Sequence, residues 1–263
     1  MFSQALCTDP EIIGRIYLQY CSLSIDGYFS DDFKDDFFPH LFSLMMKLSA
    51  TRYHLNNYIT LEQSQYLEAQ KELAENTFKT REAFELIHET EAFLFQTKSS
   101  LDILCKLLIP CIGKHSASFH TFGNKGEDLI KALKRYRKKG SPKIQAVDDL
   151  TELIRTDKEQ WLKKVIDLRD TFSHYKALGN YYFKPIKQAD NSILIEKPKL
   201  LNMETVVLLR QIFQNNLEFC QDFITCSINI VLPPAINPHP IPESIAIEKY
   251  GEHGKFVKYG LFF

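Results

Sequence analysis

The feature that most constrains this chain is a long stretch without helix-breaking residues. Between Pro39 and Pro110 lie 70 residues that include neither glycine nor proline. They are rich in Leu, Glu, Lys, Ala and Gln, which are strong helix formers. The stretch is therefore predicted to fold as long helices. One helix is expected to begin near Thr60, because Thr60 and Gln63 match a capping box, and a second is expected over residues 76–109.

Shorter helices and one hairpin are predicted in the rest of the chain. Apolar residues at three- and four-residue steps indicate the helices, and runs of strand-forming residues around a turn indicate the hairpin. The first of these helices is expected over residues 126–139 and is stopped by Gly140-Ser-Pro. The second is expected to start with the capping box of Thr156 and Glu159, and its apolar residues are Trp161, Val165, Leu168 and Phe172. The third is expected over residues 203–230, capped by Asn202. The expected strands cover residues 181–186 and 192–196, with a further short strand at 244–250.

These elements predict a mainly α fold, an up-and-down helical bundle with a small β-hairpin insert. Residues 60–232 are expected to form the bundle. Residues 1–59 are expected to be a helical and loop segment packed on the core, and residues 233–263 a proline-rich tail, all within a single domain. Apolar residues make up 44% of the 263-residue chain, which is enough to bury a core and excludes an intrinsically disordered protein.

Charge and cysteine content exclude several other classes of protein. Because 32 Lys and Arg residues nearly balance 33 Asp and Glu residues, any nucleic acid is expected to bind a local patch. No apolar run is long enough to cross a membrane, and the N-terminus lacks the basic region of a signal peptide. The six cysteines match neither zinc-site nor redox spacing, which is typical of reduced cysteines in a cytoplasmic protein. Neither a cofactor nor a metal site is expected, since glycine-rich phosphate loops and clustered metal ligands are absent from the sequence.

One basic cluster lies near the end of the helix predicted over residues 126–139. Its cations are interleaved with Tyr136 and are expected to contact an RNA backbone. The alternative interpretation is that these cations only stabilise the helix, because positive charge at a helix C-terminus interacts favourably with the helix dipole. The predicted RNA-binding residues are Lys134, Arg135, Arg137, Lys138 and Lys139, and Lys131 and Lys143 extend the cluster.

The strongest chemical signal is the group Arg169, Asp170 and His174. A histidine titrates near neutral pH and can exchange the protons of a phosphodiester cleavage, while an arginine can stabilise the charge that develops on the phosphate. On a continuous helix Asp170 and His174 share a face, whereas Arg169 and His174 lie about 140° apart. A helix break or a second copy of the chain must then bring both groups to one phosphate, and a symmetric dimer is the simpler solution. Arg81 and His88 have a similar spacing and are interpreted as a surface pair.

Two segments together resemble the HEPN superfamily. They are Glu91-Ala-Phe-Leu-Phe-Gln-Thr-Lys-Ser-Ser-Leu-Asp on one predicted helix and Leu168-Arg-Asp-Thr-Phe-Ser-His-Tyr on a later one. This superfamily comprises helical domains of prokaryotic toxins, phage-defence proteins and RNA-cleaving effectors. Its motif is an arginine, a polar residue, and a histidine after four to six intervening residues. The resemblance covers about residues 60–230.

The resemblance implies a metal-independent endoribonuclease that works as a homodimer with a composite site. RNA, tRNA included, would be the substrate, and the protein would act as a toxin or antiphage-defence effector with an antitoxin or defence-system partner. His174 would be the general acid and base, Arg169 would stabilise the transition state, and Asp170 would orient one or the other. The alternative is a non-catalytic HEPN-like module that binds nucleotide, RNA or a partner protein.

Three polar residues interrupt the apolar pattern of the helix predicted over residues 76–109. They are Glu91, Lys98 and Asp102, at seven- and four-residue steps. Two interpretations stay open. They line a cleft beside Arg169, or they pair with one another at the edge of the helix.

Overall fold

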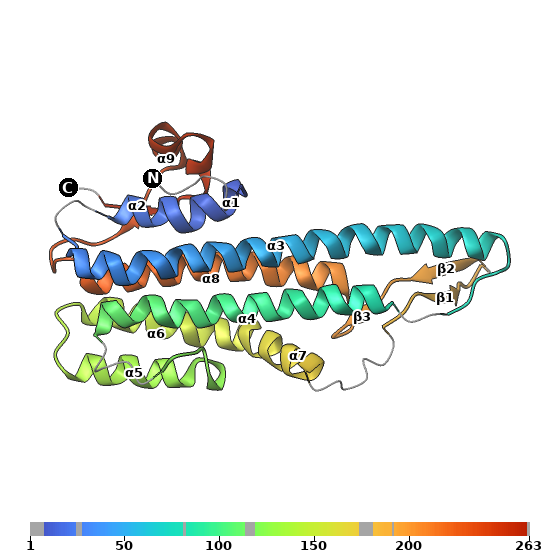
Figure 1. Ribbon diagram of the computed structural model, residues 1–263, viewed down its shortest axis with the longest axis horizontal. Coiled ribbons are helices and arrows are strands. Elements are labelled where there is room, and N and C mark those ends of the chain that lie inside the picture. Colours follow the sequence, from blue (N-terminus) through green and yellow to red (C-terminus); the bar gives the residue numbers. More distant parts are fainter. Residues whose placement is uncertain are drawn as a thin grey trace.

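Long helices lie side by side in an elongated bundle, from one end of which a small hairpin projects (Figure 1). The computed structural model describes residues 8–24, 28–80, 83–113, 119–173, 181–190 and 192–261. The prediction of a mainly α bundle with a small β-hairpin insert is confirmed. The helices are α1 (Pro10–Ile12), α2 (Gln19–Leu23), α3 (Asp31–Ala74), α4 (Phe84–Ile112), α5 (Glu127–Lys138), α6 (Ile144–Asp157), α7 (Lys163–Ser173), α8 (Thr205–Val231) and α9 (Glu243–Tyr250); the strands are β1 (Lys184–Lys187), β2 (Ile193–Glu196), β3 (Lys199–Leu200), β4 (Met203–Glu204), β5 (His239–Pro240) and β6 (Tyr259–Gly260).

Helix α3 is much longer than predicted, and the expected start at Thr60 is wrong. The helix begins after Ser30, whose Oγ accepts a hydrogen bond from the Phe33 amide at 3.2 Å, and it continues through Pro39. Thr60 lies in its middle, where its hydroxyl donates to the Asn56 carbonyl at 3.0 Å. A threonine that bonds back into its own helix does not cap a new one. The boundary expected before Thr60 therefore falls inside one continuous helix.

Helix α4 packs antiparallel against α3 over most of its length (Figure 1). It starts at Phe84 rather than near Asn76, which has a positive φ of 55° in the connection after α3. It extends past Pro110 and ends at Ile112, directly before Gly113, whose φ of 79° suits a glycine. The two long helices form the frame on which the other elements are placed.

Helices α6 and α7 form one run, joined by a π-helical segment at Lys158–Leu162. The helix expected to begin at Thr156 instead begins at Ile144, so the capping box there is not a helix start. The Trp161 indole, within the π-helical segment, donates a hydrogen bond to the carboxylate of Asp157, the residue just before the segment, at 2.5 Å. By contrast, the predicted helix at residues 126–139 is confirmed as α5, which ends just before Gly140.

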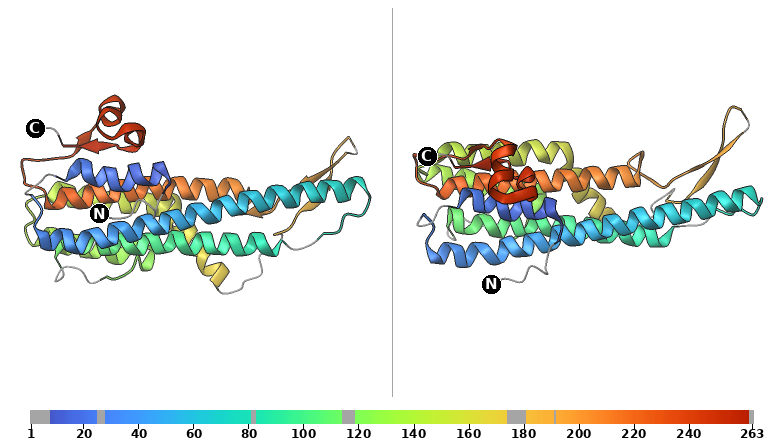
Figure 2. Two further views of the ribbon diagram at one scale, coloured as in Figure 1. Left: turned by 45° about the horizontal axis from the view of Figure 1, so that its top comes forward. Right: turned by 90° about the horizontal axis from the view of Figure 1, so that it is seen from above.

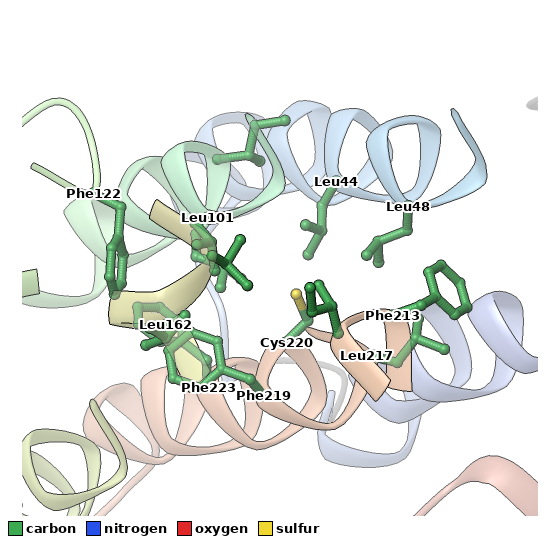
Figure 3. Close-up of a cluster of buried hydrophobic side chains, with 14 of the residues drawn as sticks. Leu44, Leu48, Leu101, Phe122, Leu162, Phe213, Leu217, Phe219, Cys220 and Phe223 are labelled. Atoms are coloured by element: carbon green, nitrogen blue, oxygen red, sulfur yellow. The ribbon is translucent and has the colours of Figure 1, made fainter. Parts of the chain in front are cut away.

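The core lies between α3, α4, α8 and the α6–α7 run (Figure 3). Helix α8 contributes the most apolar side chains, and its Phe219 contacts both Trp161 and Phe122 edge-on, with ring centroids 6.0 and 6.1 Å apart. Cys105 and Cys220 are fully buried, and burial raises the pKa of both thiols. The described cysteines are free thiols, and a thiol held neutral in this way packs as a small apolar side chain.

The predicted hairpin is confirmed as β1 and β2, which pair antiparallel with Pro185 opposite Ile195. Its base is tied to α3, where the Lys197 ammonium contacts the buried Glu62 carboxylate at 2.8 Å. Asn202 does not cap α8. It has a φ of 63° in the tight turn between β3 and β4, and α8 begins at Thr205. Asparagine favours such turns because it tolerates a positive φ.

The C-terminal segment folds back over the N-terminal helices, as two further views show (Figure 2). The short strand expected at residues 244–250 is wrong, because this segment is helix α9. A Cβ on Gly254 would overlap the Ala246 backbone, and one on Gly14 would lie 2.5 Å from the His253 carbonyl oxygen. Glycines therefore allow the close approach of these segments. Within the described residues, none of the helices combines the length and apolarity needed to cross a membrane.

Candidate functional site

Arg169 lies on α7 where this helix crosses α4. Its guanidinium sits over the Phe95 ring, with Cζ 5.6 Å from the ring centroid, and its Nη1 lies 3.1 Å from Asp170 Oδ1. The side chains of Arg169 and Asp170 are 29% and 50% exposed. The Arg169 Nε is buried and has no hydrogen-bond partner among the described residues. A partly exposed guanidinium is suited to bind an anion such as phosphate.

A side-chain hydrogen bond and two buried neighbours hold the backbone of Arg169 in place. Ser173, one turn further along α7, donates from its hydroxyl to the Arg169 carbonyl at 2.9 Å. Leu168 and Phe172 are buried beneath the helix. Because these neighbours anchor the backbone, the guanidinium is left at the surface beside Phe95.

The other predicted residues of the motif lie partly outside the described part of the chain. His174 follows the last described residue of α7, and Arg81 lies between the described ranges before α4. The predicted face shared by Asp170 and His174 therefore stays a prediction. Within the described residues Asp170 pairs with Arg169, and its expected role in orienting Arg169 or His174 stays a prediction.

Lys98 and Asp102 pair with each other at 2.5 Å on α4. The same carboxylate oxygen of Asp102 accepts a hydrogen bond from the Phe122 amide at 2.7 Å. The pair thus holds the segment that leads into α5. Of the two interpretations of this polar group, pairing at the helix edge is the one that the structure bears out for Lys98 and Asp102. Glu91 lies on the same helix, half-buried.

The predicted RNA-binding residues lie on or just after α5, and all of them are exposed. The helix is strongly amphipathic, with Leu129, Ile130 and Leu133 buried against the bundle. Arg137 pairs with Asp148 of α6 at 2.8 Å. Lys143, by contrast, is not part of this surface. Its buried ammonium contacts oxygens of Asn229, Ile236 and Asn237, and burial lowers its pKa.

An open groove of about 460 Å³ separates α5 from α6. Cations and carboxylates alternate along it, so its charges largely cancel. It does not include Arg169 or Asp170. The lining residues are Lys134, Arg137, Gln145, Asp148, Asp149, Thr151, Glu152 and Arg155.

The basic cluster and Arg169 are far apart. Asp148, the partner of Arg137, precedes Arg169 by 21 residues on the α6–α7 run. At about 1.5 Å per residue this corresponds to roughly 30 Å along the helix. The structure therefore does not bring the two predicted sites together.

Two contacts that link α5 and the turn before it to the α6–α7 run were not predicted from the sequence. Lys125 contacts Asp167 at 2.5 Å, and Lys158 contacts Glu127 at the same distance.

Phe95 was not predicted from the sequence as a functional candidate. Its signal in the sequence is an aromatic residue on the otherwise polar face of α4, at a four-residue step from Glu91.

Among the described residues, no group of three or more His, Cys, Asp or Glu side chains is placed to hold a metal ion.

Comparison with known proteins does not assign this chain to a family. No protein-family model, no curated protein and no solved structure compared with the chain matches it significantly. The functional argument therefore depends on the residues of this chain.

Proposed function

We propose that this protein is a metal-independent endoribonuclease of the HEPN type. The 2′-hydroxyl of RNA would attack the adjacent phosphorus and lose its proton to His174. The bond from phosphorus to the 5′-oxygen would break, and that oxygen would gain a proton. The products are a 2′,3′-cyclic phosphate and a 5′-hydroxyl end. We further propose that it acts in the cytoplasm as a toxin or antiphage-defence effector, held in check by an antitoxin or another defence-system partner.

The observation that carries the proposal is the environment of Arg169. A purely structural arginine would be expected to have its N–H groups satisfied, but within the described part of the chain its buried Nε has no partner. The guanidinium is anchored by Phe95 and Asp170 and remains partly exposed. A preorganised cation of this kind favours the phosphorane-like transition state, because no reorganisation is needed as charge develops.

A homodimer would complete this site. Arg169 and Asp170 lie on an open surface, and the groove between α5 and α6 does not reach them. Cleavage by a general acid and base gains from a site that excludes water. A second copy across the α7 surface would supply walls for a cleft and a second motif facing the first.

The test is cleavage of a mixture of tRNA and single-stranded RNA in the presence of EDTA. The wild-type protein is expected to cut RNA and to leave 2′,3′-cyclic phosphate ends, detected by their resistance to direct 3′-end ligation. A His174→Ala protein, purified in parallel, controls for contaminating nucleases. Cleavage that EDTA abolishes would contradict the metal-independent mechanism.

The rival function is a non-catalytic module that binds nucleotide, RNA or a partner protein. The ion pair between Arg169 and Asp170 favours it, because this contact by itself stabilises the end of α7. A well-folded dimer that binds RNA but never cuts it would support this function. Equal cleavage by the wild type and His174→Ala would also remove the nuclease assignment from Arg169 and His174.

The α5 cluster is proposed to hold the RNA backbone away from the site of cleavage. Replacing Lys134 and Lys138 by glutamine is expected to lower the slope of log affinity against log salt by about 1.4, at roughly 0.7 per lost phosphate contact with single-stranded RNA. Binding titrations at several salt concentrations measure this slope. The matched control is Lys255→Gln, an exposed lysine of the C-terminal segment. An unchanged slope would mean that the cations only stabilise the C-terminus of α5.

A further inference from the structure

Helix α4 carries three ring-bearing side chains on the side that faces solvent. Phe84 is 60% exposed, Phe95 is 39% exposed, and His88 between them is also exposed. The steps of four and seven residues place the three rings on one face of the helix. We call Phe84, His88 and Phe95 the ring face. It is unusual because the other phenylalanine of α4, Phe93, is fully buried.

Arg169 marks one end of the ring face. Its Cζ lies 5.6 Å from the Phe95 ring centroid, and none of the described residues pairs with its buried Nε. An exposed ring next to a partly exposed guanidinium matches the two parts of a nucleotide. The base stacks on the ring, and the phosphate accepts from the guanidinium. From Phe95 the ring face runs back along α4 towards His88, about 10 Å away, and Phe84, about 6 Å further.

The charges around the ring face are compatible with RNA. Glu89 is directed to α3, where it contacts the His54 ring nitrogen at 2.8 Å, and Glu85 accepts a hydrogen bond from Gln65 of α3. Glu91 lies between His88 and Phe95 on the ring face itself. A carboxylate there repels phosphate but accepts hydrogen bonds from the exocyclic amine of a base. This arrangement suits bases turned towards α4 and a backbone turned away.

We propose that the ring face binds unpaired RNA nucleotides, with one base stacked on Phe95 while Arg169 holds the neighbouring phosphate. The inference rests on the proposed function, because it assigns the substrate class of the same site. Only bases outside a duplex offer their faces to a side chain, so the substrate is single-stranded RNA or a loop. Phe95 is then a binding residue that selects the unpaired strand.

The experiment measures RNA binding without cleavage. In the His174→Ala background, a labelled single-stranded RNA of about 12 nucleotides is compared with the same RNA annealed to its complement. The single strand is expected to bind at least tenfold more tightly. Phe95→Leu should weaken its binding by about five- to a hundredfold, the loss expected for one stacked base, with little effect on the duplex. Phe95→Trp should restore binding, because it restores a ring.

The matched control is Tyr53→Leu, which removes an aromatic side chain that is 61% exposed on α3 rather than on the ring face of α4. It should leave binding unchanged. Should the Phe95 variants fail to fold, Phe84→Leu tests the far end of the ring face, because a ring 60% exposed contributes little to the core. Phe84→Leu is then expected to weaken single-strand binding at least threefold, and unchanged binding would overturn the proposal.

Several outcomes overturn the proposal. These are tighter binding of the duplex, unchanged single-strand binding by Phe95→Leu, or an equal loss in Tyr53→Leu. If Phe95→Leu dissociates a dimer but leaves single-strand binding per protomer unchanged, the ring face is an interface between two copies instead. Failure of the nuclease proposal looks different, because Phe95-dependent binding would persist in a wild-type protein that never cuts RNA.

Discussion

Replacing Arg169 by alanine is expected to lower the rate of RNA cleavage by about a hundred- to a thousandfold with little change in thermal stability. The rate falls because the developing charge on the phosphate loses its preorganised donor. Stability is nearly preserved because the side chain is partly exposed and its buried Nε makes no hydrogen bond to any described residue. Single-turnover cleavage and thermal unfolding measure the two effects.

His174→Ala is expected to lower the rate of RNA cleavage by about a hundred- to ten-thousandfold, because proton transfer is lost.

Two variants make this prediction specific. Arg169→Lys keeps the charge but loses the planar fork of donors, so it should recover only part of the rate. Arg210→Ala removes an exposed arginine of α8 and should leave the rate unchanged. A thousandfold loss in both Arg169→Ala and Arg210→Ala, or no loss in Arg169→Ala, would contradict the role assigned to Arg169.

Mixing the two inactive proteins tests whether the site is shared between two chains. In a composite site, a mixed dimer of Arg169→Ala and His174→Ala contains one site in which both wild-type residues meet. Because about half of the dimers are mixed and half of their sites are intact, roughly a quarter of the wild-type rate should return. If each chain contains a complete site, mixing restores nothing.

Replacing Gln19 by leucine is expected to lower the free energy of unfolding by about 3–5 kcal/mol. Gln19 is fully buried, and its Oε1 accepts from Gln221 Nε2 and from the amides of Lys258 and Tyr259 at 2.8–3.1 Å. Its Nε2 donates to Ser22 Oγ and to the Tyr259 carbonyl. Leucine has a similar volume but leaves these buried groups without partners, and each such loss costs about 1–3 kcal/mol.

Urea unfolding and limited trypsin digestion test this prediction together. The digestion should release the C-terminal segment early, because the backbone at Lys249, Lys255 and Lys258 can enter the protease only once the segment detaches from α2 and unfolds. Gln70→Leu, at an exposed position of α3, is the matched control and should stay within about 0.5 kcal/mol of the wild type. An equally small effect of Gln19→Leu would show that the segment is held by apolar packing alone.

Much of the secondary structure follows from local signals. The amphipathic pattern and Gly140 predict α5, and the turn between two apolar runs predicts the β1–β2 hairpin, because both signals act over a few residues. Helix boundaries were less predictable. Thr60 and Thr156 each begin a capping-box pattern, yet both lie inside long helices. The same residues are compatible with a cap and with a helix interior, and the burial of apolar residues before them decides between the two.

Long-range contacts account for the features that sequence patterns missed. The segment at residues 244–250 is helical, and it packs where Gly254 and Gly14 permit close approach. Lys143 looked like part of a basic surface, but it is buried by Asn229 and Asn237, more than 80 residues later in the chain. A pattern of residue types does not indicate which distant segment will cover a side chain, since that depends on the whole packing arrangement.

For the candidate site, the sequence by itself determined the helical class of the fold and the neighbouring positions of Arg169 and Asp170. These depend on helix periodicity and on residues adjacent in the chain. Only the tertiary structure placed Phe95 of α4 under the Arg169 guanidinium, buried the Arg169 Nε away from any partner in the described ranges, and set the α5 cluster roughly 30 Å away along the helix. The physical reason is that helices pack through side chains far apart in sequence, so which residues meet is decided by the bundle as a whole.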